Sequence, residues 1–150
     1  MRLLILGLAL VLSGATTALT AQKPDDDATV RASFVGSPQD ALPAIVAAFA
    51  EQQVTVSYFA ATDRAAVVVA GPFPHDPATE LTIRVSVWAE GDTTRLAIGG
   101  TYRLTVEAQG FQFVHRAGRG RDGDLWDRLQ QLRGAICTTL ACADNPTDGV

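Results

Sequence analysis

The sequence predicts an α+β domain in which a curved antiparallel β-sheet of about five strands packs two helices on one face. Three observations lead to this fold class. Residues 81–107 hold a long hairpin pattern, two separate stretches carry apolar residues at helical spacing, and the remaining apolar stretches are short and alternate. The expected order is strand, helix, four strands, helix. A sheet with one apolar face, covered by both helices, satisfies all of these patterns.

The segment before this domain has the order of an export signal. Arg2 is followed by a ten-residue apolar stretch, 3–12, and then by small residues up to Ala21. A membrane-spanning helix needs roughly twenty apolar residues, although a retained N-terminal anchor helix remains the alternative. We expect residues 1–21 to be a signal peptide that is cleaved after Ala18 or after Ala21. We expect no stable membrane insertion of the mature protein. No cysteine lies near the cut. We therefore expect a periplasmic or extracellular protein without a lipid anchor.

Length and charge fit one folded unit. The chain has 150 residues and a formal net charge of −4, a size suited to one domain and a sign that disfavours nonspecific nucleic-acid binding. We expect an acidic, disordered mature N-terminus over 22–28, a single domain over 29–142 and a disordered tail over 143–150.

The first elements follow from alternation and helix-start signals. Alternating residues predict a strand over 29–35, and Asp40 is the expected N-cap of a helix with Pro43 in its first turn. The helix carries an apolar stripe of Leu42, Ile45, Val46 and Phe49, and the residues 51–53 end it. A second strand is expected over 54–59 and a third over 65–70. The prolines of residues 71–77 predict a loop outside any strand ladder.

The hairpin within 81–107 is the clearest element. Pairing about a Gly91-Asp92 turn places one set of residues opposite another on a single apolar face: Leu81, Ile83, Val85, Val87 and Ala89 against Tyr102, Gly100, Ile98, Leu96 and Thr94. The same parity continues through Leu104 and Val106. On the opposite face, this register puts Trp88 directly across from Arg95 as a stacking pair.

The C-terminal part predicts a second helix and a disulfide. Asp124 is the expected N-cap of a helix over 125–137, after a glycine- and arginine-rich loop at 117–123; its apolar side is Leu125, Leu129, Leu132 and Ile136, with Trp126 beside it. Cys137 and Cys142 are expected to form a structural disulfide after export. Cα atoms five residues apart in a helix are about 8.6 Å apart, whereas a disulfide tolerates about 7 Å. The helix must therefore end between the two cysteines.

The order of elements from Thr29 to Thr138 resembles small bacterial envelope domains, such as those of the outer-membrane assembly lipoprotein family BamC, and helix-grip modules more broadly. The resemblance implies an α+β envelope domain. BamC-type proteins carry a lipid-anchor cysteine that this chain lacks.

Two groups of arginines are the candidate binding sites. Arg84, Trp88, Arg95 and Arg103 share one sheet face, and an exposed Trp among arginines is a composition typical of protein-contact patches; an ordinary solvated sheet face is the alternative. Arg116, Arg119 and Arg121 precede a helix and could hold a phosphate or carboxylate. However, Asp122 would repel an anion and Asp124 would satisfy the helix start. A solvated connector is therefore the preferred interpretation of this loop.

The spacing of the acidic residues and histidines gives little support for a metal site or a catalytic site. Asp122, Asp124 and Asp127 lack the spacing of a calcium loop, and helix capping explains them. His75 and His115 lie in separate segments, so no zinc site is expected, and no nucleophile motif is present. An enzyme would require one histidine in a cleft beside a carboxylate. We expect no cofactor.

These observations favour a non-catalytic exported domain that binds a protein partner through the Arg/Trp sheet face, with an envelope protein as the candidate partner. The alternative is a carrier of a small apolar ligand, of the helix-grip type, with a cavity between sheet and helices. The two hypotheses differ in what they require of the core. A core closed by Phe49, Trp126 and Leu129 would leave no room for a ligand.

Overall fold

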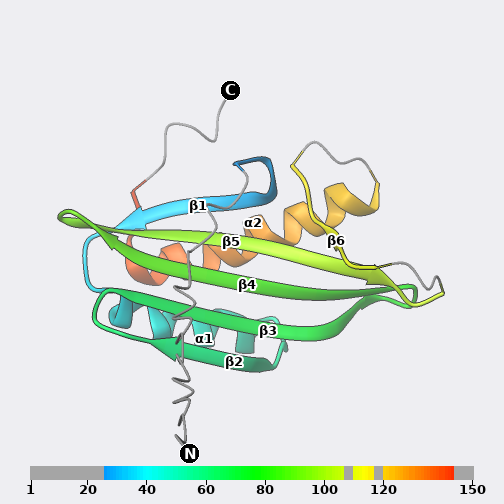
Figure 1. Ribbon diagram of the computed structural model, residues 1–150, viewed down its shortest axis with the longest axis horizontal. Helices are drawn as coiled ribbons and strands as arrows, with labels where there is room; N and C mark the ends of the chain where they lie inside the picture. The colour runs from blue at the N-terminus through cyan, green and yellow to red at the C-terminus, as the bar shows by residue number, and fades with distance from the viewer. Residues whose placement is uncertain (1–25, 107–109, 117–119, 144–150) are drawn as a thin grey trace, which may run out of the picture.

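The computed structural model describes residues 26–106, 110–116 and 120–143, and these contain one antiparallel sheet and two α-helices (Figure 1). The predicted signal segment 1–21 lies outside the described residues, as do 22–25 and 144–150. The strands are β1 (Thr29–Phe34), β2 (Val56–Ala61), β3 (Ala65–Asp76), β4 (Thr79–Glu90), β5 (Thr93–Leu104) and β6 (Gln112–Phe113). The helices are α1 (Ala41–Glu51) and α2 (Arg121–Leu140), and short 3-10 turns span Asp26–Ala28 and Pro38–Asp40.

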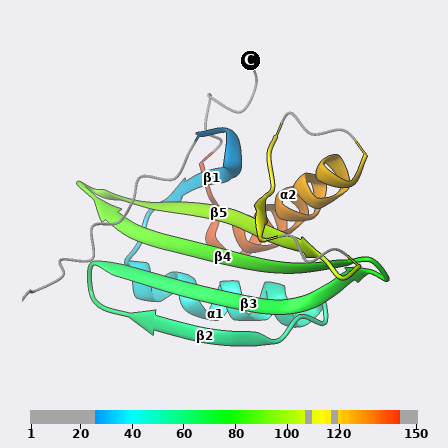
Figure 2. The ribbon, with the colours of Figure 1, turned by 45° about the vertical axis from the view of Figure 1, so that its right-hand side comes forward.

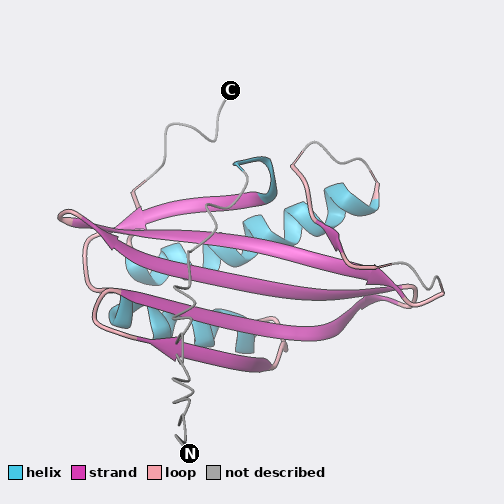
Figure 3. Ribbon diagram, viewed as in Figure 1, coloured by secondary structure: helices cyan, strands magenta, loops and turns pink. Residues whose placement is uncertain are grey.

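The sheet has the strand order β1-β5-β4-β3-β2, and β6 pairs with β5 beyond the end of β1. Both helices lie on the same face, with α1 behind β3 and α2 behind β1 and β5 (Figures 1 and 3). No described helix or strand covers the other face of the sheet, as the view in Figure 2 shows. This arrangement confirms the predicted α+β class with two helices on one face of an antiparallel sheet.

The core lies between the helices and the inner face of the sheet. Its largest fully buried side chains are Phe49, Ile45, Leu81, Ile83, Leu96, Ile98, Leu125, Leu129, Leu132, Ile136, Val30 and Val68. Each such side chain contributes roughly 1.5–3 kcal/mol through removal of its apolar surface from water. The β4–β5 pairing follows the predicted register throughout, from Leu81 opposite Tyr102 to Ala89 opposite Thr94. Val106 differs, because β5 ends at Leu104 and leaves it 84% exposed.

The prediction of a loop over 71–77 is wrong, because β3 continues to Asp76. Its pairing with β4 shifts register between Ala70 and Phe73 and again between Pro74 and Asp76. Prolines are tolerated at such bulges, where the ladder does not need their missing N–H. Gly71 has φ +105°, and a Cβ there would lie 2.6 Å from the carbonyl oxygen of Leu81. Only glycine fits this close approach. The second strand also begins later than predicted, at Val56 rather than residue 54.

The start of α1 differs in detail from the prediction. Ser37 caps the preceding 3-10 turn: its hydroxyl accepts the Asp40 N–H at 3.3 Å, and the Asp40 carboxylate accepts the Ser37 N–H at 2.8 Å. Asp40 is the N-cap residue of α1 but makes no side-chain cap bond to it. Within the predicted stripe, Ile45 and Phe49 are buried, whereas Val46 is 44% exposed. Ala41, Ala44 and Ala48 take the remaining buried positions of α1.

α2 is longer than predicted at both ends. It begins at Arg121, with Asp122 and Asp124 in its first turn, so Asp124 is not the N-cap. Acidic residues anywhere in the first turn favour a helix start, which explains the shift. The helix passes through Thr138, whose hydroxyl donates to the Gly134 carbonyl at 2.8 Å. It ends at Leu140, between the cysteines, and the Cys137–Cys142 disulfide joins Cα atoms 4.9 Å apart. Both predictions about this pair are confirmed.

Candidate functional site

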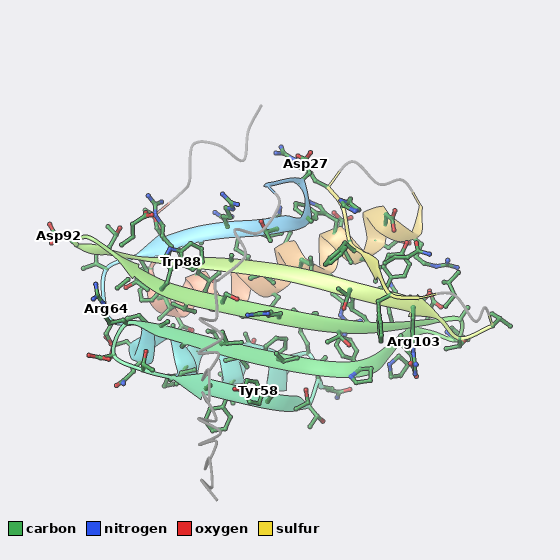
Figure 4. All side chains as sticks on the ribbon, in the orientation of Figure 1. Asp27, Tyr58, Arg64, Trp88, Asp92 and Arg103 are labelled. Carbon is green, nitrogen blue, oxygen red and sulfur yellow. A yellow bond between two sulfur atoms is a disulfide. The ribbon has the colours of Figure 1, made fainter. Side chains whose placement is uncertain are left out.

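The face of the sheet turned away from the helices, called the outer face below, carries all four residues of the predicted contact patch. The register places Trp88 of β4 between Ala65 of β3 and Arg95 of β5, as the hairpin pattern predicts. Trp88 is half-buried by these neighbours rather than substantially exposed. Figure 4 shows Trp88 toward the β4–β5 turn, marked by Asp92, and Arg103 toward the opposite end of the sheet.

The arginines of the outer face interact with acidic residues of the same face. Arg95 forms an ion pair with Glu90, and Arg103 forms one with Glu80. Arg84 donates to Ser86 at 3.3 Å. Exposed pairs of this kind contribute about 0–1 kcal/mol each, so the arginines remain available to a competing partner. The ion pair with Glu90 orients the guanidinium of Arg95.

Apolar and aromatic residues extend the outer face beyond the predicted patch. Val67 and Val69 of β3 are half-buried on it, and Tyr58 of β2 lies opposite Val69 and is 57% exposed. Phe113 of β6 lies opposite Thr101 and is 64% exposed. Sequence reasoning missed these residues because it placed the second strand two residues early and assigned no strand to 112–113. The aromatic pair Phe111 and Phe113 was the available signal.

The predicted anion-binding loop is only partly described. Arg119 lies outside the described residues. Arg121 is the first residue of α2 and lies 4.0 Å from the Asp76 carboxylate. The Ala78 N–H donates to this carboxylate at 2.7 Å and holds the pKa of Asp76 below its usual value, with Arg121 adding to the effect. Arg116 interacts through its backbone N–H with the Asp27 carbonyl at 2.8 Å. The structure does not bring Arg116 and Arg121 together around a common site.

A shallow polar depression lies between the far end of β3, the end of α1 and the first half of α2. It has a volume of about 290 Å³ and is lined by Gln52, His75, Asp124, Arg128 and Gln131. Pockets for small molecules typically begin at about 300 Å³ and are mostly apolar. This depression is therefore small, polar and open. Sequence reasoning missed Arg128 altogether, and it considered His75 as a possible metal ligand and as the histidine that an enzyme would need in a cleft.

Arg128 is the most distinctive group in this depression. Its guanidinium lies 4.9 Å from the centre of the Phe73 ring and 3.3 Å from His75 Nδ1, and burial lowers the pKa of Arg128. For the guanidinium to donate, Nδ1 must be the unprotonated ring nitrogen of His75. The lining residues include no Ser, Thr, Cys or Lys, and His75 and Asp124 are the two that could act as a base or a nucleophile. His75 and the carboxylate-bearing Asp124 therefore line the same depression, which is the arrangement that the sequence analysis required of an enzyme.

Across residues 26–106, 110–116 and 120–143, no three His, Cys, Asp or Glu residues are grouped so that they could hold a metal ion. Asp122, Asp124 and Asp127 all lie on α2, and His115 is exposed on the segment after β6. Within the same ranges, no helix has both the length and the apolar character needed to cross a membrane.

A comparison with models of known protein families gives no match, and a comparison with curated proteins gives none either.

Proposed function

We propose that this chain is an exported, non-catalytic domain that binds a protein partner through the outer face of its sheet. One observation supports the proposal: both helices cover the same face, and the face that no described element covers presents Trp88 beside Arg95, with Arg84 further along β4. Buried interface centres favour Trp and Arg, because both offer large contact areas with fixed geometry. A half-buried Trp88, held by its strand neighbours, loses little side-chain freedom when a partner binds.

The charge of the outer face indicates the chemistry of the partner. Its strands carry Arg31, Arg84, Arg95 and Arg103 against Glu80 and Glu90, while the chain as a whole has a formal net charge of −4. Complementary potentials increase the association rate and select the partner. We therefore expect an acidic surface on the partner protein. Export is proposed on the order of residues 2–21, and the intact mass of the mature protein tests it, because it must begin at residue 19 or 22.

The alternative, a carrier for an apolar ligand, receives less support from the same geometry. Phe49 and Leu129 are fully buried and pack within the core cluster, and Trp126 packs against it. The depression described above is lined by polar residues rather than by the apolar walls that such a ligand needs. The core therefore favours the binding-face proposal.

A capture experiment from envelope extract tests this proposal with wild type and Trp88→Ala. Loss of an interface centre costs about 2 kcal/mol or more, so recovery of the specific partner should fall about 30-fold. Trp126→Phe is the matched control, because Trp126 is the second tryptophan and lies on α2, on the other side of the sheet. Arg84→Glu should reduce capture as well, and added salt should weaken it. Equal recovery by wild type and Trp88→Ala would contradict the proposal.

A further inference from the structure

The surface formed by the exposed side of α1 and by β2, called the α1–β2 surface below, is unusual in composition. The stretch 41–62 contains a single charged residue, Glu51. Most of its outward residues are exposed, including Val46 at 44%, Tyr58 at 57% and Phe59 at 66%. An exposed, contiguous and nearly uncharged surface of this kind is typical of an interaction site.

α1 is apolar on both of its sides. Its buried side holds Ile45 and Phe49, while its exposed positions are Pro43, Val46, Ala47, Ala50 and, at its last residue, Glu51. A surface helix in a globular protein normally presents polar residues to water, and a helix that is apolar all round is normally covered. Within residues 26–106, 110–116 and 120–143, no other element covers this exposed side of α1.

β2 is an edge strand whose side chains do not protect it, although its pairing with β3 has one register shift, between Val56 and Tyr58. Among the described strands it pairs with β3 alone, so one of its edges is open. Natural edge strands are commonly protected by charges, prolines or lysines, and the sequence of β2, VSYFAA, contains none of these. Phe59 pairs with the buried Val68, which places it on the helix side of the sheet, and Tyr58 lies on the outer face. Both faces of this open edge are thus aromatic and exposed.

We propose that the α1–β2 surface is an interface with a second copy of this chain, formed by antiparallel pairing of β2 with β2 of the copy. Two identical strands pair in this way about a two-fold axis, so the same patch serves both partners. The charge distribution favours a copy over a different protein. An acidic chain repels its own copies elsewhere, but the stretch 52–62 carries no charge and gives a differently charged partner nothing to recognise. This proposal does not depend on the function proposed for the outer face.

The backbone of β2 defines the register of this pairing. The Thr62 N–H donates to the Ala65 carbonyl at 2.7 Å, so Thr62 faces β3. Alternation in an antiparallel ladder then turns the backbone groups of Ala61 and Phe59 toward the open edge. A two-fold axis at Phe59 pairs Phe59 with its own copy on the helix side. On the outer face, the same axis places Tyr58 opposite the small Ala60 of the copy.

Phe59 of this chain and Phe59 of the copy are needed to fill the interface. A stable interface uses about 800 Å² and 20–30 residues of each partner, which exceeds a six-residue strand, so α1 must take part. α1 packs behind β3. Across the axis, β3 and its copy are separated by three strand spacings, about 14 Å, whereas helices in direct contact lie 8–10 Å apart. The paired Phe59 rings occupy the space that remains between the two helices.

Sedimentation of the purified chain over a range of concentrations tests this proposal with Phe59→Lys. The wild type should be a dimer, and two lysines facing each other at the axis should raise its dissociation constant at least about 30-fold. Phe113→Lys is the matched control: Phe113 is 64% exposed on β6, at the other edge of the sheet, and its replacement should leave dimerisation unchanged. A monomeric wild type would overturn the proposal, and so would equal effects of the two lysine variants.

A covalent test determines the register independently of affinity. The native cysteines are joined to each other and no free cysteine is present among the described residues. Phe59→Cys should therefore form a single disulfide across the axis on mild oxidation, because directly paired strand residues lie within disulfide range. Phe113→Cys should form no intermolecular disulfide across this interface under the same conditions. Absence of the cross-link with Phe59→Cys, in a folded protein that sediments as a dimer, would contradict the β2–β2 pairing.

Discussion

The α2–β1 side of the molecule and the α1–β2 side complete the same sheet in different ways. On the α2–β1 side, Ala143 pairs with Ser33 at the edge of β1, and the Arg133 side chain donates to the Arg31 carbonyl at 2.9 Å. The Cys137–Cys142 disulfide holds the end of α2 beside these contacts. On the α1–β2 side, the open edge of β2 has no comparable contact within the described residues.

The two helices differ in the residues that they present to water. α2 presents charged residues to water, including Arg121, Asp124 and Asp127, while it buries Leu125, Leu129, Leu132 and Ile136. α1 presents mainly alanine and valine. A charged outer side completes a surface helix, whereas an apolar one leaves surface that association can bury. Among the described residues, contacts of the chain itself therefore cover the α2–β1 side, whereas the α1–β2 side leaves apolar surface and a strand edge exposed.

The largest expected effect is a difference in the free energy of unfolding between substitutions on the buried side and on the exposed side of α1. Phe49→Ala should lower the free energy of unfolding by about 3–5 kcal/mol, because it leaves a cavity in the core. Val46→Ala, on the exposed side of the same helix, should cost less than about 1 kcal/mol in the monomer. Denaturant unfolding at low protein concentration measures both, since association would add to apparent stability. Similar losses for the two variants would show that both sides of α1 are core.

The second effect concerns the α2–β1 side alone. Replacement of both Cys137 and Cys142 by alanine removes a short closed loop and should cost about 2 kcal/mol. The Ala143 N–H, which donates to the Ser33 carbonyl at 2.8 Å, should then exchange faster with solvent. Hydrogen exchange measures this, with the β2–β3 amides as the internal control. Uniform acceleration over both sides would mean that the disulfide stabilises the whole domain rather than one edge.

The smallest effect is a pH dependence at the start of α1, which begins after a carboxylate-dependent turn, unlike α2, which begins after Gly120 without a side-chain cap. The hydrogen bond from the Ser37 N–H lowers the pKa of Asp40 from its usual 3.8. A lowered folded pKa gives stability that is present above 3.8 and is lost as the pH falls through the lowered value. Asp40→Asn should therefore destabilise the protein at about pH 6 and have less effect near pH 2, as urea unfolding at both values can show. An equal loss at both pH values would remove the carboxylate from the explanation.

The register of the β4–β5 hairpin and the end of α2 could be predicted from the sequence. The alternation from Leu81 to Ala89 matched that from Thr94 to Tyr102 because the side-chain period of a strand is two, and a slip by one residue would expose the entire apolar set. The helix end between Cys137 and Cys142 followed from the distance limit of a disulfide. Both arguments use local geometry that no distant contact can change.

Other features depended on contacts between distant segments. The prolines after Gly71 predicted a loop, yet the bulges in the β3–β4 pairing accommodate them in a strand. Val46 belonged to the apolar stripe of α1, but the position of α2 and the sheet decided which side of that stripe was buried. The contact between His75 and Arg128 joins residues separated by 53 positions, and no spacing along the chain indicates it.

By itself, the sequence determined the class of the fold, the register of its central hairpin, the disulfide, and the outward position of Trp88 beside Arg95. These properties follow from periods of two and 3.6 residues and from fixed covalent distances. The tertiary structure decided that β2 would be an open edge, that α1 would turn an apolar side to water, and that Arg128 would stack on Phe73. The physical reason is that exposure is a property of the packed layers, and a residue acquires it only when its neighbours in space are in place.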